Sequence, residues 1–115
     1  MSQTMNTSSA KPEMHYLNLL QDLNFLPDKP QIEGLAEYGD LQLKKVSLKG
    51  GIELKCHQND CQVIVIWLRG KAKFFANGQE YTMQPGTLLE MPPQTPHGAM
   101  AETDCVFAVL KVQLP

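Results

Sequence analysis

The apolar positions after residue 39 follow the short alternating rhythm of β-strands. Side chains of a strand point alternately to its two faces, so a half-buried strand alternates apolar and polar residues. Glycine, proline and asparagine, which favour turns, separate the alternating segments. The pattern predicts strands over residues 41–48, 52–57, 63–68, 73–76, 79–83, 87–91, 97–101 and 105–112.

Two of these segments depart from simple alternation. Residues 63–68 read VIVIWL and are apolar throughout, which indicates a strand buried on both faces. One of those faces suits contact with a second copy of the chain, so we expect a homodimer, although the two sheets of a monomer would cover the strand equally well. Within residues 41–48 the phase slips between Leu43 and Val46, and we expect a β-bulge across Lys44 and Lys45.

The turn signals fall between the predicted strands. Gly50-Gly51, Pro85-Gly86 and Pro92-Pro93 each interrupt the alternation. Asn77-Gly78 stands between two alternating segments and predicts a tight hairpin, because both central residues of a type I′ turn need positive φ. Short strands at this spacing, with no helix between them, predict an all-β sandwich or barrel of the jelly-roll type.

The first forty residues have a different character. Residues 1–12 are small and polar, and we expect either a disordered tail or residues ahead of the natural start. Residues 13–25 carry leucine and tyrosine at positions that suit a short amphipathic helix or an edge segment, ended by Pro27 and Pro30. The expected organisation is one domain over residues 13–115 with a β core over 41–112.

Composition and charge narrow the class of protein. A chain of 115 residues with 43% hydrophobic residues forms one globular core. A net charge of −2 and the lack of a Lys/Arg run argue against a nucleic-acid partner. No apolar stretch approaches the ~20 residues of a membrane span, and the first residues do not predict a secretory signal. An odd count of three cysteines favours a reducing compartment, so we expect a cytoplasmic protein.

Glycine, proline and histidine recur in the strand region at regular spacings. The residues concerned are Gly51, His57 and Gly70, followed by Gly86, Pro92 and His97. These spacings resemble the two motifs of the cupin superfamily, and the similarity extends over about residues 41–112. The resemblance implies a double-stranded β-helix barrel, that of a small single-domain cupin of the RmlC-like, cupin 2 conserved barrel type.

The departures from the cupin motifs concern metal binding. The resemblance implies a site in which three histidines and a glutamate hold iron, manganese, nickel or zinc inside the barrel. Only His57 and His97 remain of that set, and the motif is degenerate. The other motif positions hold Asn59 for histidine, Val63 for glutamate, Gln94 for glycine and Ala101 for asparagine.

The stretch KCHQNDCQ, residues 55–62, carries most of the candidate chemistry. His57 and His97 are the candidate metal ligands, with Asn59, Cys61 and Gln62 as weaker candidates, for a divalent transition metal at partial occupancy. Local alternation places Cys56 opposite His57, and it places His57 with polar neighbours, whereas the resemblance points His57 into the barrel. The residues expected to line a ligand cavity are His57, Asn59, Val63, Val65, Trp67, Phe75, Met91 and His97.

Two functions from different classes remain open. The first is the binding of a small organic ligand in the barrel cavity, without catalysis. The alternative is a metal-dependent enzyme of the dioxygenase or isomerase type, working with the reduced ligand set around His57 and His97. The missing glutamate and histidine favour binding, and no catalytic residue is assigned. None of the segments predicts a helix-turn-helix, so these residues do not bind DNA in that way.

Overall fold

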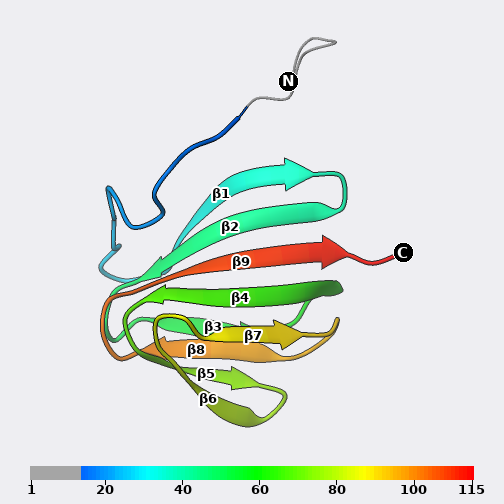
Figure 1. Ribbon diagram of the computed structural model, residues 1–115. Helices are drawn as coiled ribbons and strands as arrows, with labels where there is room; N and C mark the ends of the chain where they lie inside the picture. The colour runs from blue at the N-terminus through cyan, green and yellow to red at the C-terminus, as the bar shows by residue number, and fades with distance from the viewer. Residues whose placement is uncertain (1–13) are drawn as a thin grey trace.

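The computed structural model describes residues 14–115, which form nine strands in two antiparallel sheets (Figure 1). One sheet has the strand order β1-β2-β9-β4-β7 and the other the order β3-β8-β5-β6. Between residues 14 and 115 there is no helix, and hence none that could cross a membrane. The strands are β1 (Gln31–Tyr38), β2 (Leu41–Leu48), β3 (Glu53–His57), β4 (Cys61–Arg69), β5 (Ala72–Ala76), β6 (Gln79–Met83), β7 (Leu88–Met91), β8 (His97–Ala101) and β9 (Cys105–Gln113).

The all-β jelly-roll architecture is therefore confirmed. Each of the eight predicted strands is present, with bounds within two residues of the prediction. The hairpin between β5 and β6 turns at Asn77 and Gly78, whose φ angles of 51° and 79° are the positive pair that a type I′ turn requires. The alternation of apolar and polar residues and the turn residues predict the strand positions well, because both depend directly on backbone geometry.

The N-terminal region differs from the expectation. Residues 14–30 form turns and irregular chain, so the helix alternative is wrong. The sequence also missed β1, which pairs with β2 at the edge of the five-stranded sheet. A register shift between Gly34 and Ala36 breaks the alternation of apolar and polar residues in β1. A search for alternating residues therefore does not find this strand. The expected tail at residues 1–12 lies outside the described residues.

The bulge predicted in β2 lies on its partner strand instead. β2 pairs with β9 in unbroken register from Leu41 to Leu48, and the irregularity faces it in β1. The phase slip in β2 has another cause, because its apolar residues lie on both faces. Val46 faces the core, whereas Leu43 shares the outer face with Leu17 of the N-terminal segment. Lys45, also on that face, donates to the Leu19 carbonyl oxygen at 3.3 Å.

Aromatic packing holds the two sheets together at one end of the barrel. Trp67 of β4 is fully buried and stacks on Phe107 of β9, with ring centroids 4.2 Å apart. Phe74 of β5 meets the same indole edge-on at 6.4 Å, which is the other favoured geometry of aromatic pairs. The indole nitrogen donates to the Gly70 carbonyl oxygen at 3.0 Å, so its one polar group is satisfied. Phe74 and Phe107 of this cluster also line a cavity between the two sheets.

Candidate functional site

A cavity of about 110 Å³ lies between the two sheets at the open end of the barrel. Most of its wall is apolar and comes from both sheets. The apolar lining residues are Ile32, Val46, Leu54, Val63, Val65, Phe74, Phe107 and Val109. Four polar side chains complete the wall, namely Lys44, His57, His97 and Lys111. A mostly apolar cavity with a few convergent polar groups is the usual form of a small-molecule site.

A bulge in β3 turns His57 into this cavity. Leu54 pairs with Ala99 of β8, whereas His57 pairs with His97. Over this length β3 therefore contains one residue more than β8. The extra residue brings Leu54 and His57 to the same face, although they are an odd number of positions apart. This settles the conflict in the sequence, since the local alternation fails at the bulge and His57 does line the cavity.

Gly98 lets the bulged strand approach. A Cβ atom on Gly98 would lie 2.8 Å from the Leu54 carbonyl oxygen and 3.0 Å from the Cys56 nitrogen. Both distances are too short for a side chain, and both atoms belong to the backbone of the bulge. Glycine in a strand often marks such a close approach of another backbone. The orientation of His57 therefore depends on a residue of the neighbouring strand.

The two histidines form a contact pair. Their ring centroids are 4.3 Å apart and the rings are tilted by 56°. The Nδ1 atom of His57 lies 2.9 Å from the Lys55 carbonyl oxygen, and that of His97 lies 2.8 Å from the Thr95 carbonyl oxygen. A carbonyl oxygen only accepts hydrogen bonds, so each Nδ1 carries the proton. In the neutral form each Nε2 therefore keeps a free lone pair for a ligand.

The surroundings of His97 favour its neutral form. Its side chain is 6% exposed and stacks in parallel with the ring of Phe74. Burial lowers the pKa of His97 below its usual 6.5, the hydrogen bond to Thr95 raises it, and the nearby His57 and Lys111 lower it further. His97 is thus an acceptor at neutral pH, placed where a protonated ligand group or an anion would change its charge.

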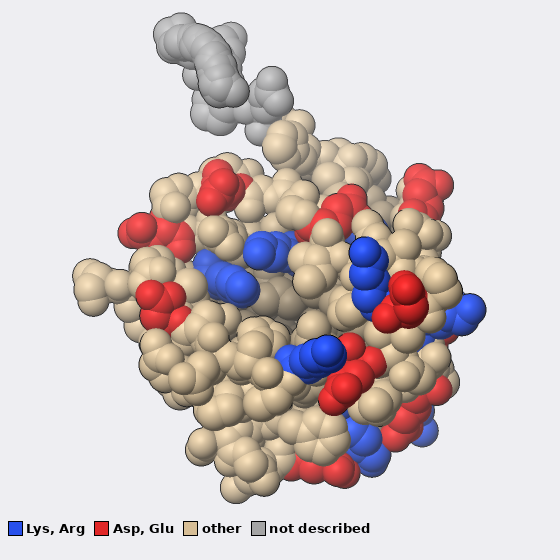
Figure 2. All heavy atoms as spheres, turned by 180° about the vertical axis from the view of Figure 1, so that it is seen from behind, with Lys and Arg blue, Asp and Glu red and all other residues tan. Residues whose placement is uncertain are grey.

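Two lysines from adjacent strands reach the same cavity. Lys44 of β2 and Lys111 of β9 are both half-buried. Burial lowers the pKa of Lys111, the charge of Lys44 lowers it further, and Cys61 raises it. Figure 2 shows a hollow on one face of the molecule with basic side chains at its border. Sequence reasoning missed both lysines, although Lys44 is in phase with Val46, and the β2 alternation could have revealed it.

The structure brings together only part of the expected cavity lining. His57, His97, Val63 and Val65 line the cavity. Trp67 and Met91 are buried in the core and do not line it. Phe75 is 43% exposed on the outer face, and its neighbour Phe74 lines the cavity instead. In β5 the residues that point inward are Ala72, Phe74 and Ala76. The prediction placed the inward side chains one residue later, and this is why it named Phe75.

The weaker metal candidates make contacts outside the cavity that holds the histidine pair. The Oδ1 atom of Asn59 accepts from the Cys61 nitrogen at 3.0 Å, and its buried Nδ2 has no partner among the described residues. The Cys61 thiol lies 3.6 Å from the Gln113 side-chain oxygen. On the outer face, Gln62 donates to Glu90 at 3.2 Å. None of these three side chains lines the cavity.

The donor set by itself does not complete a transition-metal site. Within residues 14–115 no group of three or more His, Cys, Asp or Glu side chains lies close enough together to hold an ion. Two imidazoles remain, whereas protein sites for these metals use three or four ligands. The position of the family glutamate holds Val63, which has no donor atom.

A double-sheet β-barrel with motif histidines at its open end defines a small cupin. The family model of the AraC-like ligand binding domain matches residues 53–115, and the chain belongs to that family. One further motif feature fits, since Gln94, at a glycine position of the cupin motif, has a positive φ of 66°. The backbone keeps the left-handed conformation there without the glycine.

Solved structures agree with this assignment. An RmlC-like cupin from Desulfovibrio desulfuricans is 25% identical, with 88% of this chain and 98% of the other covered and a TM-score of 0.81. A conserved protein of unknown function from Streptococcus pyogenes is 23% identical, with 90% and 91% covered and a TM-score of 0.78. KdgF from Halomonas sp. is 26% identical, with 83% and 87% covered and a TM-score of 0.70. A comparison with proteins of curated function gives no match.

Proposed function

We propose that this chain binds a small organic molecule in the barrel cavity, with His57 and His97 as its polar contacts and without catalysis. The observation that carries the proposal is the pairing of two hydrogen-bonded histidines with a mostly apolar cavity. His57 is exposed at the cavity and His97 is buried beside it. Here each Nδ1 is fixed by a carbonyl oxygen, and each Nε2 is left for a ligand. The family, an AraC-like ligand binding domain, supports the same function.

The apolar and the polar residues of the cavity wall contribute differently to ligand binding. Val63, Val65 and Phe74 offer a rigid apolar surface on which a compact hydrocarbon body loses its contact with water. The imidazoles fix orientation, because a buried polar group of the ligand without a partner is costly. Both histidines are positioned by backbone carbonyl groups, so little side-chain entropy is lost on binding.

A ligand screen with a blocked cavity tests the proposal. We would screen small organic molecules by thermal shift and by changes in amide NMR signals, on the intact chain and on V109F. Val109 lines the cavity, and a phenylalanine there fills it. V112F is the matched control, since residue 112 lies on the same strand with its side chain on the opposite face.

Ligands of the cavity should bind the intact chain and V112F and should lose at least tenfold in affinity in V109F. NMR spectra of both variants check that they are folded, because overpacking a core costs about 1–3 kcal/mol. If V109F does not fold, shifts of the His57 and His97 ring signals on ligand addition to the intact chain decide the matter. Ligands that bind V109F undiminished and leave those ring signals unmoved would refute the proposal.

A metal-dependent enzyme is the second candidate, and one observation favours it. The two Nε2 atoms are free and their rings are in contact, which is how neighbouring imidazoles of a metal site are prepared. Elemental analysis of protein exposed to iron, manganese, nickel and zinc separates the two candidates. Near-stoichiometric metal that is lost in both H57A and H97A would favour the enzyme, whereas metal-free protein in every preparation would exclude it.

A further inference from the structure

The charged groups of the cavity all have the same sign. Its four polar lining residues are two lysines and two histidines, and no aspartate or glutamate of the described chain lines it. A cavity lined by like charges in a low-dielectric wall attracts and concentrates ions of the opposite sign. The chain as a whole has a net charge of −2, so the basic cavity is a local arrangement and does not follow from composition.

The two lysines lack protein partners. Among the residues that the structure describes, neither Lys44 nor Lys111 forms an ion pair or a hydrogen bond, and their charges repel each other. By contrast, Lys45 is ion-paired with Glu33 at 3.6 Å and Lys73 with Glu80 at 3.6 Å. Both residues are half-buried, and an anionic ligand would supply the counter-charge that the protein does not.

The register brings both ammonium groups within reach of one anion. Lys44 stands opposite Val109, two residues before Lys111 on the same strand, so the lysines are diagonal neighbours on one face of the sheet. Diagonal neighbours on adjacent strands are about 7–8 Å apart. Flexible side chains with three donors each can therefore both contact a carboxylate placed between them.

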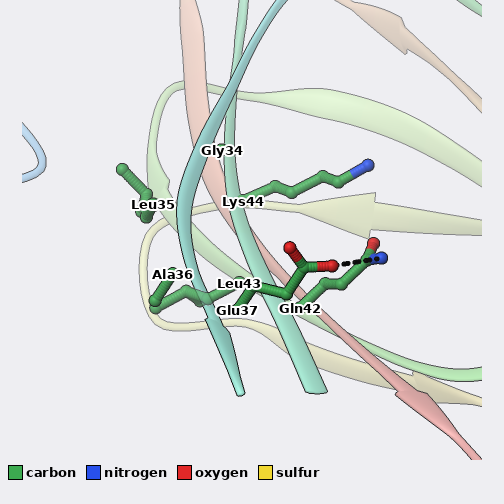
Figure 3. A pocket seen from close by; sticks show the side chains of 7 residues that line it. All are labelled: Gly34, Leu35, Ala36, Glu37, Gln42, Leu43 and Lys44. Carbon is green, nitrogen blue, oxygen red and sulfur yellow. Dashed lines mark hydrogen bonds between the residues drawn. The ribbon is translucent and has the colours of Figure 1, made fainter. Parts of the chain in front are cut away.

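One acidic residue lies near this pair, on the rim of the sheet. Glu37 projects to the same side of β1 and β2 as Lys44, as Figure 3 shows, while Leu43 projects to the other side. Its carboxylate accepts a hydrogen bond from Gln42 at 3.3 Å and makes no ion pair with either lysine. Glu37 therefore weakens the positive field around Lys44 without neutralising it.

The size and wall of the cavity limit the body of the anion. A dry cavity of ~150 Å³ holds a molecule of the size of benzene, and this cavity measures about 110 Å³. Eight of its twelve lining residues are apolar, which suits a hydrocarbon body and does not suit a sugar or a polyanion. The expected ligand is compact and carries one charged group at one end.

We infer that the cavity binds a small organic monocarboxylate, with its carboxylate between Lys44 and Lys111 and its apolar body against Val65 and Phe74. The inference rests on the proposed function and specifies the chemical class of its ligand. At Nε2 the neutral histidines accept hydrogen bonds and donate none, so they contact a donor group of the ligand and not its carboxylate oxygens. A neutral molecule of the same shape gains the apolar contacts but leaves both ammonium groups unpaired.

Matched pairs of probes test the inference. Isobutyrate is compared with isobutyramide, and isovalerate with its amide, by isothermal titration and by amide NMR on the full chain. Each pair differs in charge and hardly in shape. A hydrogen bond to a charged group contributes enough to change affinity by about 10- to 100-fold, so the carboxylates should bind at least tenfold more tightly than the amides.

Variants then assign the difference to the two lysines. The double variant K44M/K111M keeps the aliphatic stems and should lose at least tenfold in carboxylate affinity while amide affinity stays the same. K73M is the control, because it removes one charge from the outer face and costs only an exposed ion pair. E37Q, which removes the acidic group at the rim, should strengthen carboxylate binding severalfold.

Three results would overturn the inference. Equal binding of amides and carboxylates would leave the proposed ligand-binding function in place and refute the anionic class. Tighter binding of isobutyl phosphate than of isovalerate would refute the monocarboxylate. If no carboxylate binds, the monocarboxylate inference is refuted. The wider screen with V109F then decides separately whether the cavity binds any molecule.

Discussion

At the mouth of the cavity two imidazole rings lie in contact, and each directs Nδ1 to a carbonyl oxygen two residues earlier in the chain. This arrangement fixes both tautomers without any help from a charged partner. Protonation of His97 is also unfavourable, because its ring is buried and a positive charge there would lie near His57 and Lys111. The histidines are therefore polar contacts that respond to what binds beside them.

The low pKa of His97 predicts a stability that falls on acidification. The unfolded chain takes up a proton near pH 6.5 while the folded chain resists it, so folding is weakened as pH falls from 6.5 towards the lower pKa of the folded state. Each unit of pKa lowering corresponds to about 1.4 kcal/mol. Urea unfolding at pH 7.5 and 5.5 measures the loss, which should shrink in H97Q. An equal loss in H97Q would contradict the assignment to this residue.

Alanine substitutions at Gly70 and Gly78 distinguish the cost of backbone strain from the cost of a steric clash. Both have positive φ, 85° and 79°, but a Cβ on Gly70 would lie 2.2 Å from the Asp104 carbonyl oxygen, whereas nothing lies within 4 Å at Gly78. G78A should therefore cost about 1–2 kcal/mol from the left-handed conformation alone. G70A should cost more than about 3 kcal/mol, because backbone must also move. Chemical unfolding of the two variants compares them directly, and equal losses would contradict the contact.

At the scale of elements, the bulge in β3 decides which side chains enter the cavity. One additional residue between Leu54 and His57 reverses the phase of the strand and brings a histidine inward. The strand can bulge only where its partner offers space, and Gly98 of β8 offers it. A single glycine on one strand thus controls the orientation of a functional side chain on another.

G98A should displace β3 and turn His57 out of the cavity. The added methyl group would meet the Leu54 oxygen and the Cys56 nitrogen, so we expect a loss of about 1–3 kcal/mol in stability. We also expect weaker through-space NMR signals between the His57 and His97 rings. G34A is the control, because Gly34 lies beside the bulge of β1 with nothing within 4 Å. Unchanged ring contacts in G98A would show that the bulge does not need the glycine.

The sequence predicts this fold well wherever alternation is unbroken. Strands β2 to β9 were found in this way, and the cupin spacings added the inward direction of His57. Prediction fails where an element departs from period two, as in β1 with its bulge after Gly34 and in β3 before His57. The two lysines were missed for another reason. Charged residues are expected outside, and only the register of β2 and β9 shows that Lys44 and Lys111 point inward.

At the scale of the whole molecule, the outer face of the five-stranded sheet carries apolar residues across its strands. Leu43, Leu110 and Ile64 stand side by side on β2, β9 and β4, and Ile66 pairs with Leu88 of the edge strand β7. Leu88 is 58% exposed. The N-terminal segment covers the end of this face near Leu43, so an apolar strip over β4 and β7 is left for a partner.

A homodimer through this strip remains a prediction, and light scattering after gel filtration tests it. We expect a mass near twice the 12.9 kDa of one chain. I66E should shift the mass to that of a monomer, because a charge buried between two sheets without a partner is costly. F75E, with its change on the outer face of the other sheet, is the control and should stay dimeric. A monomeric intact chain would exclude the dimer.

The pairing of Val63 with Lys111 restricts how this barrel can change in evolution. Val63 stands where the cupin motif has its glutamate, and directly opposite residues on adjacent strands are about 4.5–5.5 Å apart. A V63E substitution would therefore place a carboxylate beside the Lys111 ammonium group and form an internal ion pair. The lysine would have to be replaced before that carboxylate could serve a metal. The effects of substitutions at the two positions are therefore not additive.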